Sequence, residues 1–188
     1  MNIIGFIASS RKEGNTAWAV NTILEGAKAR GAETQSWCYG GVDIKPCRGC
    51  SACKKEGKGC VIHDDMQGIY AALADAGAVV LGSPVYMGQM SAQAKTFTDR
   101  LYACMSPRFS PHFKEGAAKK KMVLVFTQGN PDPALFQPYF EYTKNMFRTL
   151  EFDVTAVQVI AGTRDKRACE RSDLRALLND AGSALVPE

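Results

Sequence analysis

Long apolar runs are missing from this chain of 188 residues. No stretch approaches the roughly 20 consecutive apolar residues that a membrane-spanning helix needs. The N-terminal segment MNIIGFIASSRK has no charged start, and its apolar run is too short for a secretory signal peptide. We therefore expect a soluble, cytoplasmic protein that does not act at a membrane.

A strong excess of one charge is also missing. The 23 Lys and Arg residues outnumber the 19 Asp and Glu residues only slightly, which gives a formal net charge of +4. The basic run 119–121 directly precedes an apolar segment and is best explained as a solvated strand entrance, so the sequence does not predict nucleic-acid binding. Internal repeats, low-complexity segments and linkers are absent, which predicts a single domain over residues 1–188.

What the chain does contain is a regular alternation of strand and helix patterns. Apolar, β-rich runs predict five strands at 2–8, 34–39, 78–84, 121–129 and 154–162. Helical periodicity predicts five helices between them and after the last strand, the third of which is capped by Ser91. This alternation predicts an α/β fold, a doubly wound parallel sheet with helices on both faces. Ligands of such sheets bind at the carboxyl ends of the strands, near the switch point.

The first loop at that edge, ASSRKEGNT (8–16), has the residues of a phosphate site. It offers polar donors and one fixed cation next to the positive end of a helix dipole; these residues are Ser9, Ser10, Arg11, Asn15 and Thr16. Neither a Walker loop nor a G-x-G-x-x-G motif is present, so a single phosphate fits better than a pyrophosphate. The alternative is an ordinary polar turn in which Asn15 or Thr16 caps the helix.

The second and third loops add features that suit a flat aromatic ligand. SPVYMGQMS (83–91) places Tyr86 and Met87 beside Gly88, where backbone amides and apolar side chains could hold a ring. The alternative is that Tyr86 fills a gap in the structure. TQGNPDP (127–133) brings further hydrogen-bond donors to the same edge of the sheet.

With these three loops the chain resembles the flavodoxin-like NAD(P)H-dependent FMN reductases, and among them the iron–sulfur flavoproteins. Members commonly read G-S-P-R-K-x-G-N-T in the first loop, where this chain has Ala8 for Gly and Ser10 for Pro. The segments GSPVYMGQMSAQAKTFTDR and TQG also resemble the family's second and third flavin loops. The resemblance spans nearly the whole chain, is weakest at 105–120 and after about residue 160, and implies a five-stranded sheet of order 2-1-3-4-5.

The resemblance also implies a cofactor site. Ser9, Ser10, Arg11, Asn15 and Thr16 would hold the FMN phosphate; Pro84, Val85, Tyr86, Met87 and Gly88 would line the isoalloxazine; and Thr127, Gln128 and Gly129 would complete the pocket. The flavin N5 accepts hydride, so no catalytic side chain is expected. Electrons would come from NAD(P)H or ferredoxin, and the family usually forms homodimers or homotetramers.

Four of the seven cysteines lie in CRGCSACKKEGKGC (47–60), within a cysteine-rich loop that we place at 43–63. In a reducing cytosol, clustered cysteines indicate a metal site or catalysis. Cys47, Cys50 and Cys53 are spaced for three corners of a cubane, with Cys60 as the fourth ligand, whereas zinc sites usually pair two separated C-x-x-C knuckles. The motif resembles that of the iron–sulfur flavoproteins, where it binds a [4Fe–4S] cluster. A cluster-free loop, zinc and a redox disulfide remain alternatives.

Three functions fit this sequence. The one we predict is an iron–sulfur flavoprotein that passes electrons between a [4Fe–4S] cluster and FMN. The alternative is a cluster-free NAD(P)H-dependent FMN or quinone reductase. The third is an electron carrier of the flavodoxin type without turnover, which the net charge of +4 disfavours because such carriers are usually acidic.

Overall fold

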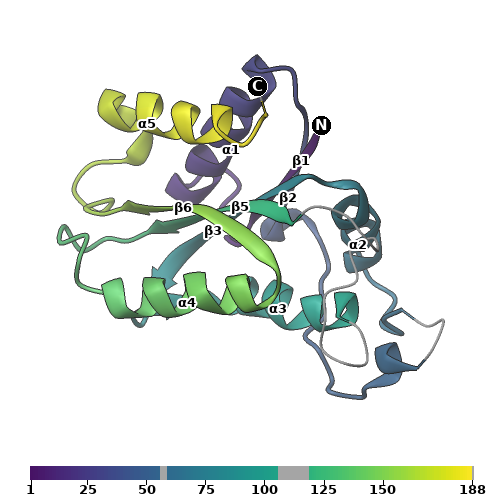
Figure 1. Cartoon of the computed structure of the whole chain (residues 1–188). Coiled ribbons are helices and arrows are strands. Elements are labelled where there is room, and N and C mark those ends of the chain that lie inside the picture. The colour runs from purple at the N-terminus through teal and green to yellow at the C-terminus, as the bar shows by residue number, and fades with distance from the viewer. Residues whose placement is uncertain (56–58, 106–118, 188) are drawn as a thin grey trace.

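The computed structural model describes residues 1–55, 59–105 and 119–187 (Figure 1). Its sheet has five long parallel strands, β1 (Asn2–Ile7), β2 (Glu33–Cys38), β3 (Ala78–Tyr86), β5 (Lys120–Thr127) and β6 (Phe152–Ile160). They stand in the order β2-β1-β3-β5-β6, and the short β4 (Gln89–Met90) pairs antiparallel with the end of β3. Counted without β4, this is the predicted order 2-1-3-4-5.

Helices cover both faces of this sheet (Figure 1). Their bounds are α1 (Asn15–Ala29), α2 (Met66–Asp75), α3 (Ala92–Arg100), α4 (Gln137–Thr149) and α5 (Ser172–Ser183). The apolar faces of α1 and α5 pack on one side of the sheet, and those of α2, α3 and α4 pack on the other. Because the central strands are buried on both faces, they read as continuous apolar runs. Among the described helices, none is long and apolar enough to cross a membrane.

Two glycines let the α1 layer pack closely. A Cβ atom on Gly82 of β3 would lie 2.4 Å from a methyl group of Val20, and one on Gly182 of α5 would lie 1.9 Å from the carbonyl oxygen of Ile23. Any larger residue at these positions would push α1 away from β3 or α5. The same Cβ atom on Gly82 would lie 3.0 Å from the methyl group of Thr16, so the first turn of α1 is also held close to β3.

The ends of β1 and β3 are joined by serine hydroxyls. Ser91 Oγ donates to the Ala8 carbonyl (2.8 Å) and accepts from the Ala94 N–H (3.2 Å), which confirms Ser91 as the cap of α3. Ser83 Oγ accepts from the Ser91 N–H (2.9 Å). These bonds fix the first two predicted loops relative to each other.

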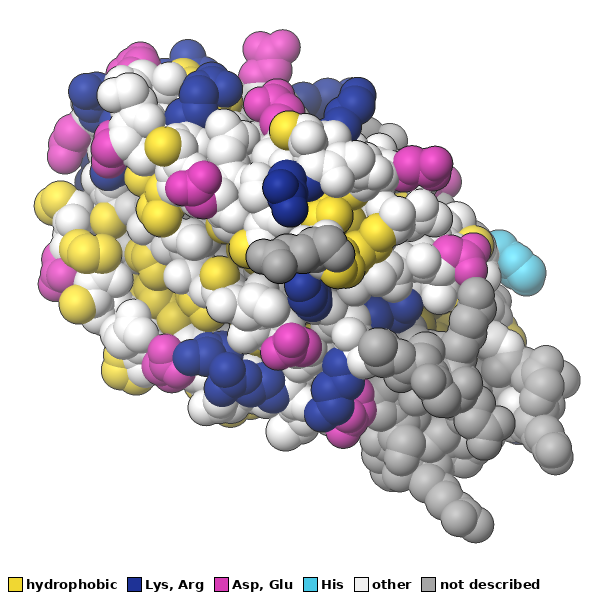
Figure 2. Space-filling model, turned by 45° about the horizontal axis from the view of Figure 1, so that its top comes forward, with side chains coloured by type: hydrophobic (Ala, Val, Ile, Leu, Met, Phe, Trp, Pro, Cys, Tyr) yellow, Lys and Arg dark blue, Asp and Glu magenta, His cyan; other side chains and the backbone are white. Residues whose placement is uncertain are grey.

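The outer surface carries charges of both signs. Figure 2 shows the face that includes α1 and α5, and basic and acidic side chains are interspersed on it. This distribution agrees with the small formal net charge of +4.

Candidate functional site

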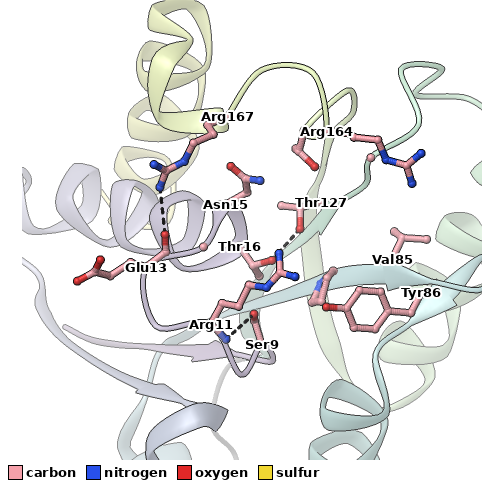
Figure 3. A pocket seen from close by; sticks show the side chains of 14 residues that line it. Ser9, Arg11, Glu13, Asn15, Thr16, Val85, Tyr86, Thr127, Arg164 and Arg167 are labelled. Carbon is pink, nitrogen blue, oxygen red and sulfur yellow. Dashed lines mark hydrogen bonds between the residues drawn. The ribbon is translucent and has the colours of Figure 1, made fainter.

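A cavity of about 610 Å³ opens at the carboxyl edge of the sheet (Figure 3). Small-molecule pockets commonly measure about 300–1,000 Å³. The lining residues are Ser9, Arg11, Glu13, Gly14, Asn15, Thr16, Pro84, Val85, Tyr86, Thr127, Gly129, Thr163, Arg164 and Arg167. All three loops singled out in the sequence therefore reach one cavity. Of the predicted cofactor residues, Ser10, Met87, Gly88 and Gln128 do not line it.

The first loop places the uncapped N-terminus of α1 at this cavity. Gly14 is the N-cap of α1 and has no side chain that could accept from the first N–H groups. Ser9 Oγ accepts from the Arg11 N–H (3.1 Å) and shapes the turn before the helix. Neither Asn15 nor Thr16 caps α1, so the alternative of an ordinary capped turn is wrong. The first-turn N–H groups and the helix dipole favour an anion here.

Thr16 and Asn15 instead connect the first loop to its neighbours. The hydroxyls of Thr16 and Thr127 share a buried hydrogen bond of 2.7 Å, which joins the first loop to the third. Asn15 Oδ1 accepts from the Ala168 N–H (2.8 Å) and so binds the segment after β6. The Asn15 oxygen is thus structural, while its amide NH₂ can still donate to a ligand.

The second loop is a tight hairpin between β3 and β4. Its two central residues, Met87 and Gly88, have φ angles of +50° and +79°, as a two-residue type I′ turn requires. This turn directs Met87 away from the cavity, and its side chain is 99% exposed. Tyr86 lines the cavity and is 54% exposed, so it does not fill a gap in the core.

Gln128 builds the third loop from inside. Its side chain is buried, and Nε2 donates to the carbonyls of Asn130 (3.3 Å) and Asp132 (2.7 Å). Its Oε1 atom has no hydrogen-bond partner among the described residues. Gln128 therefore shapes the loop from which Thr127 and Gly129 line the cavity.

A fourth wall, which the sequence reasoning missed, comes from the segment after β6. Thr163 donates to the Gln128 carbonyl through both its N–H (3.1 Å) and its hydroxyl (3.0 Å). The same segment places Arg164 and Arg167 in the cavity. The signal was TRDKRA (163–168), directly after the last predicted strand, because the carboxyl ends of parallel strands share one edge. It was overlooked because the family resemblance is weak after about residue 160.

The cavity is positively charged. Three arginines line it, and the lining includes one carboxylate, that of Glu13. Within the described part of the chain, no ion pair joins Arg11, Arg164 or Arg167 to a carboxylate. Unpaired guanidinium groups in a cleft attract anionic ligands, and their fork geometry suits phosphate.

The cysteine-rich loop is closed at its base by two aspartates. Asp65 exchanges hydrogen bonds with the backbone of Asp43 (2.7 and 3.1 Å). Asp64 accepts from the Lys45 N–H (2.9 Å) and forms a two-pronged ion pair with Arg100 of α3 (2.6 and 3.0 Å). The Arg100 and Asp64 side chains are only 1% and 0% exposed. The base of the loop is therefore fixed to α3.

Tyr70 of α2 completes this network. Its hydroxyl donates to the Arg100 carbonyl (2.8 Å) and accepts from Arg100 Nε (3.2 Å). Burial alone raises the pKa of Asp64, but the hydrogen bonds from Arg100 and Lys45 outweigh it and hold that pKa below its ordinary value. Burial also raises the pKa of Tyr70. Asp64 is thus ionised and paired at neutral pH.

The loop is anchored a second time by Lys54. Its ammonium group donates to the Tyr102 carbonyl and to that of Met105 (2.7 Å), beyond the 3₁₀ turn η3 (Leu101–Cys104) that follows α3. At the other end of α3, Gln93 contacts Ser10 of the first loop (3.4 Å). The nine residue steps from Gln93 to Tyr102 span roughly 14 Å of helix axis. The cysteine loop and the first loop thus meet opposite ends of α3.

The thiols of the loop form no disulfide in this structure. All seven cysteines are free; Cys47 and Cys50 are exposed, and Cys53 and Cys60 are half-buried. Across 1–55, 59–105 and 119–187, no group of three His, Cys, Asp or Glu side chains is placed to hold a metal ion. Residues 56–58, in the turn before Cys60, lie outside the described residues. The four predicted ligand thiols are therefore free and at least partly exposed, but in the described part of the chain they are not arranged to hold a metal ion.

Comparison with known proteins decides the family. The model of the NADPH-dependent FMN reductase family matches residues 1–135. The chain belongs to this family.

Curated relatives of this FMN reductase-family chain are named iron-sulfur flavoproteins. One from Methanocaldococcus jannaschii is 42% identical over 100 residues, which cover 53% of this chain and 51% of the relative. One from Methanosarcina thermophila is 37% identical over 118 residues, or 63% of this chain and 61% of the relative. The chain thus spans about half the length of the curated relatives it matches.

Solved structures confirm the flavodoxin-like α/β fold. A flavone reductase superposes with a TM-score of 0.73 at 16% identity, over 98% of this chain and 62% of that one. An NAD(P)H:quinone oxidoreductase from Methanothermobacter marburgensis superposes with a TM-score of 0.70 at 14% identity, over 100% and 98%. At these identities the likeness extends to the fold alone.

Proposed function

We propose that the chain is an FMN-dependent oxidoreductase that takes electrons from NAD(P)H or ferredoxin and passes them to a small-molecule acceptor. The observation that carries this proposal is the cavity. One end of it holds the uncapped N-terminus of α1 and arginines without ion-pair partners among the described residues. The other end is lined by Pro84, Val85 and Tyr86. Family membership supports FMN as the ligand.

The residues present fit FMN. Arg11 and the first-turn N–H groups of α1 would bind the phosphate, and the buried Thr16–Thr127 pair would keep the first and third loops in register. Val85 and Tyr86 would contact the ring. When bound, FMN supplies the hydride and electron chemistry at N5, and the protein supplies position and electrostatics.

This proposal is tested by oxidation of NADPH and NADH by the full chain, with a quinone as acceptor and FMN titrated in. We expect turnover that depends on FMN and saturates with it. Reduced ferredoxin replaces the nicotinamide donor in a parallel assay. A chain that binds no FMN, or whose turnover with every donor ignores FMN, would contradict the proposal.

We further propose that Cys47, Cys50, Cys53 and Cys60 hold a [4Fe–4S] cluster that exchanges electrons with the flavin. The spacing of the thiols and the names of the curated relatives support this step. Because the thiols are not gathered in the described part of the structure, the loop must close around the cluster when it is loaded.

The cluster-free alternative is a NAD(P)H-dependent FMN or quinone reductase. It is favoured by the exposure of Cys47 and Cys50, which leaves half of the ligand set on the surface. Iron and acid-labile sulfide per chain, measured after purification without oxygen, separate the two. About four of each per chain supports the cluster, and flavin without iron supports the alternative.

A further inference from the structure

Arg167 lies on a segment that is fixed to both sides of the cavity. The Ala168 N–H, next to Arg167, donates to Asn15 Oδ1 at the first turn of α1 (2.8 Å). At the other end of the segment, the Gly162 N–H donates to the Asn130 carbonyl (2.8 Å), with Gly162 at a φ of +71°. The backbone that carries Arg167 is therefore positioned before any ligand arrives.

The Arg167 guanidinium sits at the N-terminal end of α1. Nη2 donates to the carbonyl of Glu13, the residue before the N-cap Gly14, at 3.4 Å (Figure 3). Figure 3 shows the Glu13 carboxylate pointing away from Arg11 and Thr16. A hydrogen bond of this length is weak. The guanidinium thus remains available to a stronger acceptor at the same helix end.

A phosphate monoester is a multiply charged anion that several cationic donors can share. Such a group carries about −1.5 to −2 charges at pH 7, whereas Arg11 contributes one positive charge and a helix N-terminus about half of one. Arg167 is a second lining cation at that helix end, which it contacts through its bond to the Glu13 carbonyl. With Arg167, the positive charge at this end of the cavity reaches about 2.5, which exceeds that of the phosphate and so favours a phosphate-bearing ligand over a neutral one.

From this geometry we propose that Arg167 is a second cationic ligand of the FMN phosphate, supplied by the segment after β6. The inference rests on the proposed function, since it assumes that FMN occupies the cavity. Asn15 then has a positioning role, because its side chain holds the backbone next to Arg167. The phosphate would join the first loop to the C-terminal segment, which are 154 residues apart.

The test titrates FMN and riboflavin, which lacks the phosphate, into flavin-free full-length chain. The variants are Arg167→Met, Arg167→Lys and, as the control, Lys166→Met, which removes the same charge from an exposed neighbour that does not line the cavity. We expect Arg167→Met to raise the Kd for FMN about tenfold and to leave that for riboflavin within about twofold. Arg167→Lys should recover part of the loss, and Lys166→Met should change neither Kd.

Thermal unfolding of each variant shows whether it folds, and riboflavin binding reports an intact ring site. If wild type prefers FMN over riboflavin and Arg167→Met keeps that preference, the inference is wrong while the proposed function stands. The inference is also overturned if Arg167→Met weakens FMN and riboflavin binding equally. The same holds if Lys166→Met weakens FMN binding as much as Arg167→Met does. If wild type binds neither flavin, the inference and the proposed function fail together.

Discussion

Single residues at the cavity divide into those that face a ligand and those that build the loops. Arg11 faces the cavity and lacks an ion-pair partner among the described residues. The side chains of Gln128 and Asn15, in contrast, form hydrogen bonds with the loop backbone. Arg11 is therefore a cleaner probe of phosphate binding than Asn15.

Arg11→Ala should weaken FMN binding by about 1.5–3 kcal/mol, because charge-assisted hydrogen bonds to the phosphate are lost. Riboflavin binding should change little. Isothermal titration of both ligands measures the difference. An equal loss for both would show that Arg11 acts on the ring site or on folding rather than on a phosphate.

Loss of Arg100 should cost substantial stability. Arg100→Met would leave the buried Asp64 carboxylate without its partner, and breaking such a pair costs about 3–5 kcal/mol. Lys95→Met is the matched control, because it breaks an exposed ion pair with Asp99 on the same helix and should cost under about 1 kcal/mol. Urea unfolding of both variants checks the difference, and similar losses would contradict the assigned role of Arg100.

The same pair predicts a pH dependence. The pKa of Asp64 is lower in the folded chain than in the unfolded chain, where it is about 3.9. Ionised Asp64 therefore contributes fully to the free energy of unfolding at pH values above its unfolded-state pKa. This contribution is lost as the pH falls through the lower pKa that Asp64 has in the folded chain. Asp64→Asn should flatten the acid limb of the stability curve, measured by urea unfolding between pH 2 and pH 6. If the acid limb is unchanged in Asp64→Asn, the loss of stability at low pH comes from other carboxylates and the role given to Asp64 is wrong.

Among the elements, α3 separates two sites. Its first turn contacts the first loop through Gln93, and the turn after it holds the cysteine loop through Lys54. Changes in one loop should therefore leave the other functional.

Cys50→Ala or Cys53→Ala should remove most of the iron and leave the FMN content unchanged, because each thiolate of a cubane holds one iron. Cys169→Ala, an exposed thiol far away in the sequence, serves as the control and should alter neither. Iron and flavin per chain are measured after purification and reconstitution under nitrogen. Loss of FMN together with iron would contradict the independence of the two loops.

The elements themselves were predictable from sequence, and their side-chain partners were not. Apolar runs and helical periodicity located the strands and helices, and Ser91 was recognisable as a cap because its partner is three residues away. The Arg100–Asp64 pair joins residues 36 positions apart, and no local pattern marks such a contact. The fourth wall did have a local signal, the arginines directly after the last predicted strand, but its contact with the first loop, between Ala168 and Asn15, joins residues 153 positions apart.

At the scale of the whole molecule, the order of the strands creates the site. The order β2-β1-β3-β5-β6 places the loops after β1, β3, β5 and β6 around one cavity. The doubly wound pattern predicted that edge correctly, but which residues face the cavity depended on turn geometry. The left-handed turn at Met87 and Gly88, for example, directs Met87 outward.

The most direct test of the account is the cofactor content of the full chain, purified without oxygen and reconstituted with FMN. We expect about one FMN per chain, bound more tightly than riboflavin, with NAD(P)H or reduced ferredoxin bleaching the flavin absorbance. A chain that takes up no FMN under these conditions, or that binds riboflavin equally well, would contradict the assignment of the cavity to FMN.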